Sequence, residues 1–347
     1  MAKVAVIGAG SWGTALALVL ADNEHEVKLW GRRQEQMDEV THKHTNHKYL
    51  PNITLPPSIE GTVDLKKAIT GAEFIVLVTP TKVIREMVQQ LIKVMEKEAV
   101  IIHASKGIEP GTHKRVSEMI SEEFEQTNFM KDLIVLSGPS HAEEVALRQP
   151  TTVTASSLNI NAAEQVQDLF MNHHFRVYTN ADLIGVEIGG SLKNIIGLVC
   201  GLTNGLGYGD NTKAAIMTRG LAEMARLGIK LGANPMTFSG LSGLGDLIVT
   251  CTSVHSRNWR AGQMIGQGLV LDEVLDKMGM VVEGVRTTKA THELATKLNV
   301  EMPITNALYK VLFEQVNPKE AAELLMGRLK KHEVEEVSNY LLTEIDQ

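Results

Sequence analysis

Short apolar runs alternate with longer amphipathic stretches along the first half of the 347-residue chain. The runs with the length and β-branched content of strands are residues 3–7, 26–30, 74–78, 100–103 and 133–136. The helix-like stretches between them are residues 11–22, 34–43, 82–96 and 114–125. Strands that are apolar on both sides and separated by helices predict a parallel sheet covered on both faces. Weaker strands at 151–155 and 175–178, with a helix at 162–171 between them, extend the predicted sheet to about residue 180.

The pattern changes beyond residue 182, where helical periodicity replaces the strand-like runs. The helices predicted there are residues 214–231, 271–278, 287–298, 303–313 and 318–329. Of the 29 glycines, 14 lie between Gly185 and Gly245. We therefore expect an α/β fold, with an N-terminal parallel-sheet domain over residues 1–184 and a mainly α-helical C-terminal domain over residues 185–347.

A glycine-rich turn follows the first predicted strand. Gly8, Gly10 and Gly13 fit the pattern G-x-G-x-x-G between strand 3–7 and helix 11–22. In this context the first glycine makes a tight turn, the second admits a pyrophosphate and the third allows close helix–strand packing. The alternative is a turn that merely connects strand to helix. The strand–turn–helix context favours a Rossmann-type dinucleotide-binding domain, with phosphate at the helix N-terminus.

The end of the second predicted strand bears on the choice between NAD and NADP. An NAD-preferring site usually places Asp or Glu there, about 20 residues past the glycines, to bind the ribose 2′-hydroxyl. After Trp30 this chain instead has Gly31, Arg32 and Arg33, and the next carboxylate is Glu35. Two guanidinium groups suit a 2′-phosphate, so the sequence favours NADPH, with exposed arginines at a helix start as the alternative.

Composition and charge narrow the range of partners. Hydrophobic residues make up 44% of the chain and charged residues 22%, which excludes a disordered protein. Acidic residues outnumber basic residues by 41 to 34, and no run of four Lys or Arg occurs, so we expect no nucleic-acid partner. The net charge of −7 still allows a local cationic pocket for a small anion.

The cysteines and the N-terminus bear on location. The two cysteines, Cys200 and Cys251, make no disulfide framework, and a reducing compartment fits them best. The uncharged stretch 4–21 superficially resembles a secretory signal, but glycines interrupt it where a signal helix should be strongest. We expect a cytoplasmic protein without stable membrane insertion, and a homodimer is compatible with the sequence.

Two lysines are candidates for a site that binds a small anionic substrate. Lys106 lies in a Ser-Lys-Gly loop after strand 100–103, and open α/β sheets bind ligands at the carboxyl ends of their strands. Lys193 and Asn194 interrupt a segment that otherwise has the pattern of a buried helix. A buried lysine loses its proton readily, which makes Lys193 a candidate proton acceptor for an alcohol. The alternative for Lys193 is a side chain that reaches the surface along its apolar stem.

Residues 240–258 form a glycine-rich, polar segment that we expect to be a loop leading into a helix at 259–264. The segment contains Asp246 and the pair Arg257 and Asn258. A guanidinium beside the start of a helix suits a phosphate, and an ordinary surface loop is the alternative.

No metal site is expected from the sequence. His42, His44 and His47 have no carboxylate or thiol at ligand spacing, and lysines lie between and beside them. Cys251 and His255 lack a third group that would orient them as nucleophile and base.

Six blocks of the sequence together resemble bacterial NAD(P)-dependent glycerol-3-phosphate dehydrogenases over essentially the whole chain. The blocks are GAGSWGTALA (8–17), SKGIEP (105–110), LSGPSHAEEV (136–145), GVEIGGSLKNI (185–195), SGLGDLIVTCTSVHSRN (242–258) and VVEGVRTT (281–288). The glycine turn is generic to nucleotide-binding folds, whereas the LKN and DLIVTC…SRN blocks are distinctive. The resemblance implies reversible hydride transfer between dihydroxyacetone phosphate and sn-glycerol 3-phosphate, which supplies the glycerol backbone of phospholipids.

The matching motifs imply which residues of this chain are catalytic, which bind the substrate and which bind the cofactor. The resemblance implies that Lys193 is the catalytic proton acceptor when the alcohol is oxidised. It implies a substrate site lined by Lys106, Gly138, Ser140, Lys193, Asn194, Asp246, Ser256, Arg257 and Asn258. It implies NADP or NAD as cofactor, bound by Gly8, Gly10, Ser11, Trp12, Gly13, Arg32, Arg33, Lys106, Ala142, Arg257, Val281 and Glu283.

Two alternatives stay open at this point. One is another lysine-dependent dehydrogenase of the same layout, of the 3-hydroxyacid or 6-phosphogluconate type. The other is a non-enzymatic dinucleotide sensor, which has no need of Lys193, Asp246 and Arg257 together.

Overall fold

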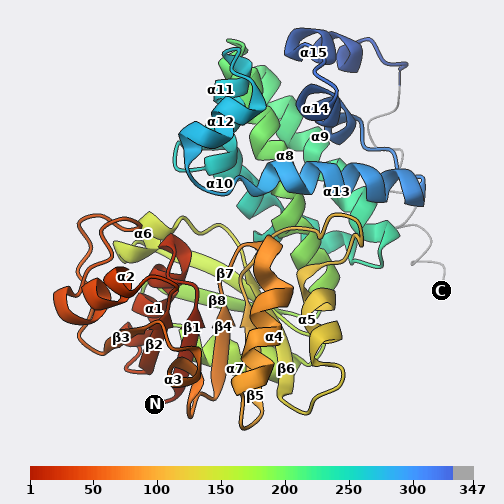
Figure 1. The fold of residues 1–347 in the computed structure, drawn as a ribbon. Coiled ribbons are helices and arrows are strands. Elements are labelled where there is room, and N and C mark those ends of the chain that lie inside the picture. Colours follow the sequence, from red (N-terminus) through yellow and green to blue (C-terminus); the bar gives the residue numbers. More distant parts are fainter. Residues whose placement is uncertain (331–347) are drawn as a thin grey trace. The chain divides into compact units, whose positions relative to one another are not determined.

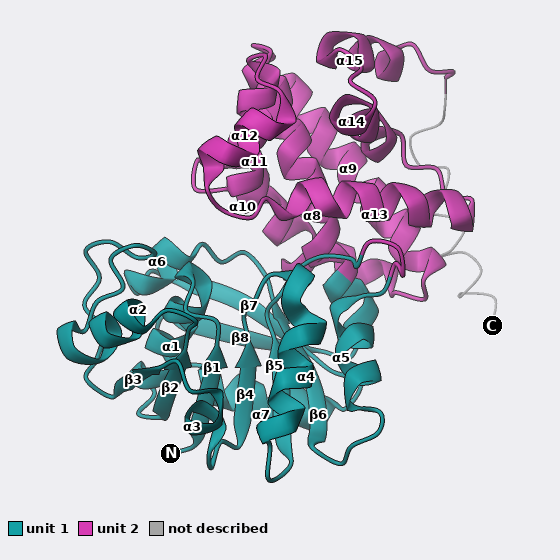
Figure 2. Cartoon of the chain, viewed as in Figure 1, with its two compact units in different colours: residues 1–109, 114–187 teal, residues 110–113, 188–347 magenta. Residues whose placement is uncertain are grey.

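The computed structural model describes residues 1–330, and the chain divides into two compact units (Figures 1 and 2). Unit 1 comprises Met1–Glu109 and Lys114–Glu187, and unit 2 comprises Pro110–His113 and the chain from Ile188 onward. The division after Glu187 falls inside helix α8 (Leu183–Gly205), whereas the sequence suggested a boundary after residue 184. The last part of the expected second domain, residues 331–347, lies outside the described residues.

Within residues 1–330, unit 1 is built on an eight-stranded sheet of order β3-β2-β1-β4-β5-β6-β7-β8. The strands are β1 (Lys3–Ile7), β2 (Glu26–Trp30), β3 (Ile59–Thr62), β4 (Phe74–Leu77), β5 (Ala99–His103), β6 (Met130–Ser137), β7 (Thr151–Ser156) and β8 (Phe175–Asn180). The helices are α1 (Ser11–Asp22), α2 (Gln34–Asp38), α3 (Leu65–Ile69), α4 (Ile84–Val94), α5 (Val116–Phe124), α6 (Ala142–Ala146) and α7 (Ile160–Phe170). Parallel pairing from β3 through β6 confirms the predicted α/β fold.

Two features of the sheet differ from the sequence prediction. β3 was not predicted, because its four residues, Ile-Glu-Gly-Thr, include a charge and a glycine and form no apolar run. β7 pairs with β6 in the antiparallel direction, with Ser137 opposite Thr154. The connection between these strands contains the five-residue helix α6 and returns at the end of the sheet where β6 finishes, so the paired strands run in opposite directions.

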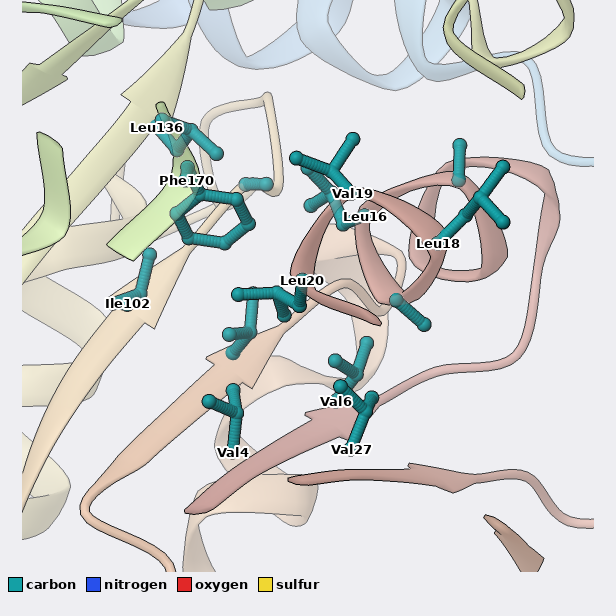
Figure 3. Packing of buried hydrophobic residues seen from close by; sticks show 14 of the residues in the cluster. Val4, Val6, Leu16, Leu18, Val19, Leu20, Val27, Ile102, Leu136 and Phe170 are labelled. Carbon is teal, nitrogen blue, oxygen red and sulfur yellow. The ribbon is translucent and has the colours of Figure 1, made fainter. Parts of the chain in front are cut away.

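Helices cover both faces of the sheet, because alternate residues of each strand point to opposite sides. Val4 and Val6 of β1 pack with Leu16 of α1 in one apolar cluster, shown close up in Figure 3. Ala5 and Ile7 belong to another cluster, which they share with residues of α3, α4 and α5. Because helices exclude water from both faces of the sheet, polar residues can reach a ligand only from the loops at the strand ends.

Unit 2 is built of helices, which Figure 1 draws from green to blue. After α8 they are α9 (Asp210–Lys230), α10 (Asp246–Thr252), α11 (Arg257–Gly266), α12 (Leu271–Met278), α13 (Glu283–Leu298), α14 (Pro303–Phe313) and α15 (Pro318–Met326). The bounds of α12 and α14 are those predicted. The prediction of a loop over residues 240–258 is wrong for most of that segment, because a π turn at Leu241–Gly245 leads directly into α10. Burial of Leu247 and Cys251 favours a helix there despite the glycines.

α8 is buried along almost its whole length. By length and composition it could cross a membrane, but 89% of its apolar stretch is buried inside the structure, as in a core helix. Its glycines allow α11 to lie directly against its backbone. A Cβ at Gly201 would stand 1.9 Å from the carbonyl oxygen of Trp259, and one at Gly205 would stand 2.3 Å from that of Gln263. The glycine enrichment of this region therefore reflects close packing of helices.

Candidate active site

The glycine turn between β1 and α1 has the geometry of a phosphate site. Gly8 has a φ of +124°, and a Cβ there would lie 2.6 Å from the carbonyl oxygen of Val78. A Cβ at Gly13 would lie 1.9 Å from the carbonyl oxygen of Gly8, so the fold itself requires these two glycines. At Gly10 a Cβ would meet nothing within 4 Å among the described residues. The open space beside Gly10, at the start of a 12-residue helix, fits the pyrophosphate of a dinucleotide.

Two exposed arginines follow the end of β2, where the sequence placed a 2′-phosphate contact. Arg33 immediately precedes α2, and its guanidinium donates to Oε1 of Gln36 at 3.0 Å. The Arg33 guanidinium lies 5.7 Å from the ring centroid of Tyr49, and Nζ of Lys48 lies 5.9 Å from the same centroid. Arg32, which precedes Arg33 in the sequence, is also exposed. This arrangement provides a cationic rim that suits a phosphate.

The other residues assigned to the cofactor in unit 1 surround the same helix. Ser11 donates its hydroxyl to the backbone oxygen of Tyr49 at 2.9 Å. Trp12 is half-buried against the apolar cluster of Figure 3. Ala142 is the first residue of α6, which packs against α1.

The loops after β5 and β6 come together at the carboxyl edge of the sheet. Nζ of Lys106 donates to the backbone oxygen of Gly138 at 3.4 Å, and the Ser140 hydroxyl donates to the same oxygen at 3.0 Å. Gly138 has a φ of +143°, and a Cβ there would lie 2.9 Å from Cα of Val153. These three predicted site residues therefore form one group.

In unit 2, Lys193 of α8 pairs with Asp246, the first residue of α10, through a hydrogen bond from Nζ to Oδ1. Lys193 is 9% exposed and Asp246 is fully buried. A buried ion pair is stable only when both charges are satisfied. The sequence anticipated that Lys193 is buried but not that a carboxylate partners it. The two side chains thus form a buried ion pair within unit 2.

A hydrogen-bonded chain of amides lies next to this pair. Nδ2 of Asn258 donates to Oδ1 of Asn194 at 2.9 Å, and Oδ1 of Asn258 accepts from the backbone N–H of Gly284 at 2.9 Å. A Cβ at Gly284 would lie 2.7 Å from the backbone oxygen of Asn194. The sequence reasoning missed Gly284, although it lies in the block VVEGVRTT that carries part of the resemblance.

The start of α11 carries the arginine expected to bind phosphate. Ser256 is the N-cap residue, and its hydroxyl accepts from the backbone N–H of Trp259 at 3.2 Å. The helix begins at Arg257, two residues earlier than predicted, so the guanidinium stands at a helix N-terminus. Arg257 is exposed and donates to the backbone oxygen of Val281 at 3.3 Å. Val281 in turn precedes α13, which begins at Glu283.

Other candidates take no part in these groups. Glu187 of α8 belongs to a separate buried cluster in unit 1. The contact with Cys200 and burial raise the pKa of Cys251 well above its usual value, which argues against a nucleophilic thiol. Among residues 1–330, no group of three or more His, Cys, Asp or Glu side chains could hold a metal ion.

Comparisons with known proteins agree over both units. Residues 3–163 match the family model of the NAD-dependent glycerol-3-phosphate dehydrogenase N-terminus, and residues 182–323 match the model of its C-terminus. The glycerol-3-phosphate dehydrogenase [NAD(P)+] of Shouchella clausii is 68% identical over 335 residues, covering 96% of this chain and 98% of that protein. The protein of the same name from Bacillus cytotoxicus is 64% identical, covering 97% of this chain and 98% of its own length.

A solved structure extends the similarity to three dimensions. The glycerol-3-phosphate dehydrogenase of Coxiella burnetii superposes with a TM-score of 0.89 at 38% identity, covering 94% of this chain and 99% of that one. A structure of D-mandelate dehydrogenase, at 15% identity and a TM-score of 0.59, shares the fold alone. Both family models, the identity to the bacterial relatives and the structural match lead to the same assignment. The chain belongs to the NAD-dependent glycerol-3-phosphate dehydrogenase family.

Proposed function

We propose that the chain interconverts dihydroxyacetone phosphate and sn-glycerol 3-phosphate with NAD(P)(H), and that Lys193 moves the proton. The observation that carries the proposal is the buried pair of Lys193 and Asp246. A dinucleotide sensor that performs no chemistry has no use for such a pair, since burying two charges is costly. The names of the relatives favour glycerol 3-phosphate over the substrates of the 3-hydroxyacid and 6-phosphogluconate enzymes.

Oxidation of a secondary alcohol releases a proton from its hydroxyl group, and reduction of the ketone takes one up, so the site needs a group that accepts and donates a proton. A nicotinamide dinucleotide held at the turn around Gly10 would supply the hydride donor or acceptor for C2 of the substrate. In reduction, the Lys193 ammonium polarises the carbonyl oxygen and donates a proton to it. In oxidation, the neutral amine accepts the hydroxyl proton. Asp246 orients Nζ through their hydrogen bond.

The phosphate of the substrate requires positive charge that the chain as a whole does not provide, because its net charge is −7. Arg257 supplies a guanidinium and α11 supplies the N-terminal end of its dipole. Asn258 and Asn194, held by their mutual hydrogen bond, supply amide groups next to the lysine. Ser256 completes this part of the site, while Lys106, Gly138 and Ser140 form the substrate-binding group of unit 1.

The cofactor contacts follow from the two ends of the proposed dinucleotide. The turn at Gly10 receives the pyrophosphate, with Ser11 and Trp12 at the start of the same helix. Arg32 and Arg33 bind the 2′-phosphate, so NADPH is favoured over NADH. Further contacts come from Lys106, Ala142, Arg257, Val281 and Glu283.

The cellular role follows from the product. We assign the chain to the cytoplasm, where sn-glycerol 3-phosphate supplies the backbone of glycerophospholipids. Burial of α8 as a core helix and the lack of a basic run agree with a protein that acts on small molecules, without membrane insertion or nucleic acid. A homodimer is compatible with this role.

A steady-state assay tests the proposal. Dihydroxyacetone phosphate is reduced with NADH and with NADPH, and 6-phosphogluconate and a 3-hydroxyacid are offered for oxidation in parallel. We expect turnover with dihydroxyacetone phosphate and a higher kcat/KM with NADPH. Turnover of 6-phosphogluconate alone would favour the related dehydrogenases, and dinucleotide binding without turnover would favour a sensor.

A further inference from the structure

Glu187 is a buried carboxylate that the proposed mechanism does not use. It lies near the start of α8 and is 6% exposed. Its Oε1 accepts from the backbone N–H of Ser117 at 2.8 Å, and its Oε2 accepts from the Ser117 hydroxyl at 2.5 Å. Nη1 of Arg115 donates to Oε2 at 2.6 Å, and Nε2 of His103 lies 3.3 Å from Oε1. One carboxylate therefore contacts three other side chains and a helix N-terminus.

These contacts lie at the two ends of one loop. His103 is the last residue of β5, whereas Arg115 and Ser117 stand at the beginning of α5. The chain between them, residues 104–114, carries Lys106 three positions after the end of the strand. Glu187 thus bridges the start and the end of the Lys106 loop.

The interior of the loop is held by its own backbone and by a neighbouring side chain. The backbone N–H of Glu109 donates to the oxygen of Lys114 at 2.9 Å, which closes the second half of the loop, residues 109–114. The Thr81 hydroxyl donates to the backbone oxygen of Lys106 at 3.2 Å. A loop whose ends are fixed and whose middle is closed keeps Nζ of Lys106 at a defined place beside Gly138.

The cluster is charged, although it is removed from water. Burial raises the pKa of Glu187, but the contacts with His103, Arg115 and Ser117 outweigh burial and hold that pKa below its usual value. A well-packed apolar side chain would often stabilise a fold as well as a buried ion pair does. Stability alone therefore does not account for an ionised carboxylate here. Its hydrogen bonds to Arg115 and Ser117 fix the end of the loop, and the His103 ring packed 3.3 Å from Oε1 lies at the start of the loop.

We propose that Glu187 is a positioning residue for the reaction, which holds both ends of the loop 104–114 and thereby fixes the ammonium of Lys106 beside Gly138. The inference rests on the role of Lys106 in the proposed function. Glu187 itself touches neither substrate nor cofactor in this assignment.

A double-mutant cycle tests the inference. Glu187→Gln keeps the side-chain volume and removes the charge, and it is measured in the natural chain and in Lys106→Ala. We expect kcat/KM for dihydroxyacetone phosphate to fall at least about tenfold in the natural chain, and less than about twofold when Lys106 is already removed. A residue with a merely structural role would lower kcat/KM by the same factor in both backgrounds.

Glu223→Gln is the matched control, because Glu223 is likewise a buried carboxylate that accepts N–H groups at a helix start. The Glu223→Gln substitution should change kcat/KM for dihydroxyacetone phosphate less than about twofold, even if it lowers the melting temperature of the protein. Arg115→Gln repeats the cycle should Glu187→Gln fail to fold, and the same dependence on Lys106 is expected.

The outcomes separate the inference from the proposed function. Equal losses in both backgrounds, or an unchanged kcat/KM in folded Glu187→Gln, would overturn the positioning role while the Lys106 assignment stands. Full activity of Lys106→Ala alone would remove Lys106 from the proposed function, and the inference would fall with it.

Discussion

The stability of unit 2 should depend on pH through Glu223, a carboxylate in α9 that caps another helix. α14 begins at Pro303, and the residue before it, Met302, has no polar side chain to serve as a cap. Glu223 takes this place, accepting from the backbone N–H groups of Ile304 at 2.5 Å and Thr305 at 3.2 Å. It is only 2% exposed. Burial raises its pKa from the usual 4.5 to about 7, although these hydrogen bonds oppose the rise.

The sign of the effect follows from proton binding. Between about pH 4.5 and 7 the folded chain keeps a proton on Glu223 that the unfolded chain has released. The contribution of Glu223 to the free energy of unfolding is therefore fully present below about pH 4.5, and it is lost as the pH rises through about 7. The shift is equivalent to about 3 kcal/mol in total, of which about 2.5 kcal/mol falls between about pH 5 and 8.

Urea unfolding of the natural chain and of Glu223→Gln from about pH 5 to 8 measures this contribution, because the amide does not titrate. The free energy of unfolding of the natural chain minus that of Glu223→Gln should decrease by about 2.5 kcal/mol over this range. Asp210→Asn is the control, since the Asp210 side chain is 96% exposed, and its difference from the natural chain should vary by less than about 0.5 kcal/mol. A Glu223→Gln difference that is equally flat would refute the reasoning.

Three further predictions concern activity. Lys193→Ala should lower kcat at least about 10²-fold without loss of dinucleotide binding, measured by steady-state kinetics and fluorescence titration; near-normal turnover would remove Lys193 from the mechanism. Replacing Arg32 and Arg33 together by Ala should weaken NADPH far more than NADH, and equal weakening would show that they do not select the 2′-phosphate. Arg257→Ala should lower kcat/KM for dihydroxyacetone phosphate roughly tenfold to a hundredfold while sparing the poor activity on unphosphorylated dihydroxyacetone, with partial recovery in Arg257→Lys. Equal losses on both substrates would show that Arg257 does not bind the substrate phosphate.

Elements with a strong period could be predicted from the sequence with nearly correct bounds. α1, α12 and α14 begin and end where the pattern placed them. α14 buries Ile304, Leu308 and Leu312 in one stripe at helical spacing. The strand β1 was equally clear because Val4, Ala5, Val6 and Ile7 are all buried. β2 was clear because buried and half-buried residues alternate over Glu26–Leu29.

Elements whose local composition opposes their structure were missed. The segment at Leu241–Gly245 contains two glycines within five residues and still continues into α10, because buried contacts override propensity. β3 likewise exists because β2 offers it a parallel edge, with Gly61 opposite Leu29.

The candidate site was predictable as a set of residue types but not as a set of contacts. The sequence indicated Lys193 as a buried amine, yet Asp246, its partner, lies 53 positions away. The bond from Gly284 to Asn258 and the cluster around Glu187 are also tertiary contacts. No local pattern encodes them, because each depends on which helix or strand the fold brings alongside.

The contact between α8 and α11 limits how long a substrate the proposed site can hold. Lys193 is on the first helix and Arg257 begins the second, so the separation of these helices bears on the span between the proposed proton donor and the proposed phosphate-binding arginine. At Gly201 and Gly205 that separation is already at the limit of backbone against backbone. An engineer who wishes to admit a longer phosphorylated polyol will find no side chain to trim at this contact. The helices themselves would have to be moved apart, which makes chain length the property of the substrate that is hardest to redesign.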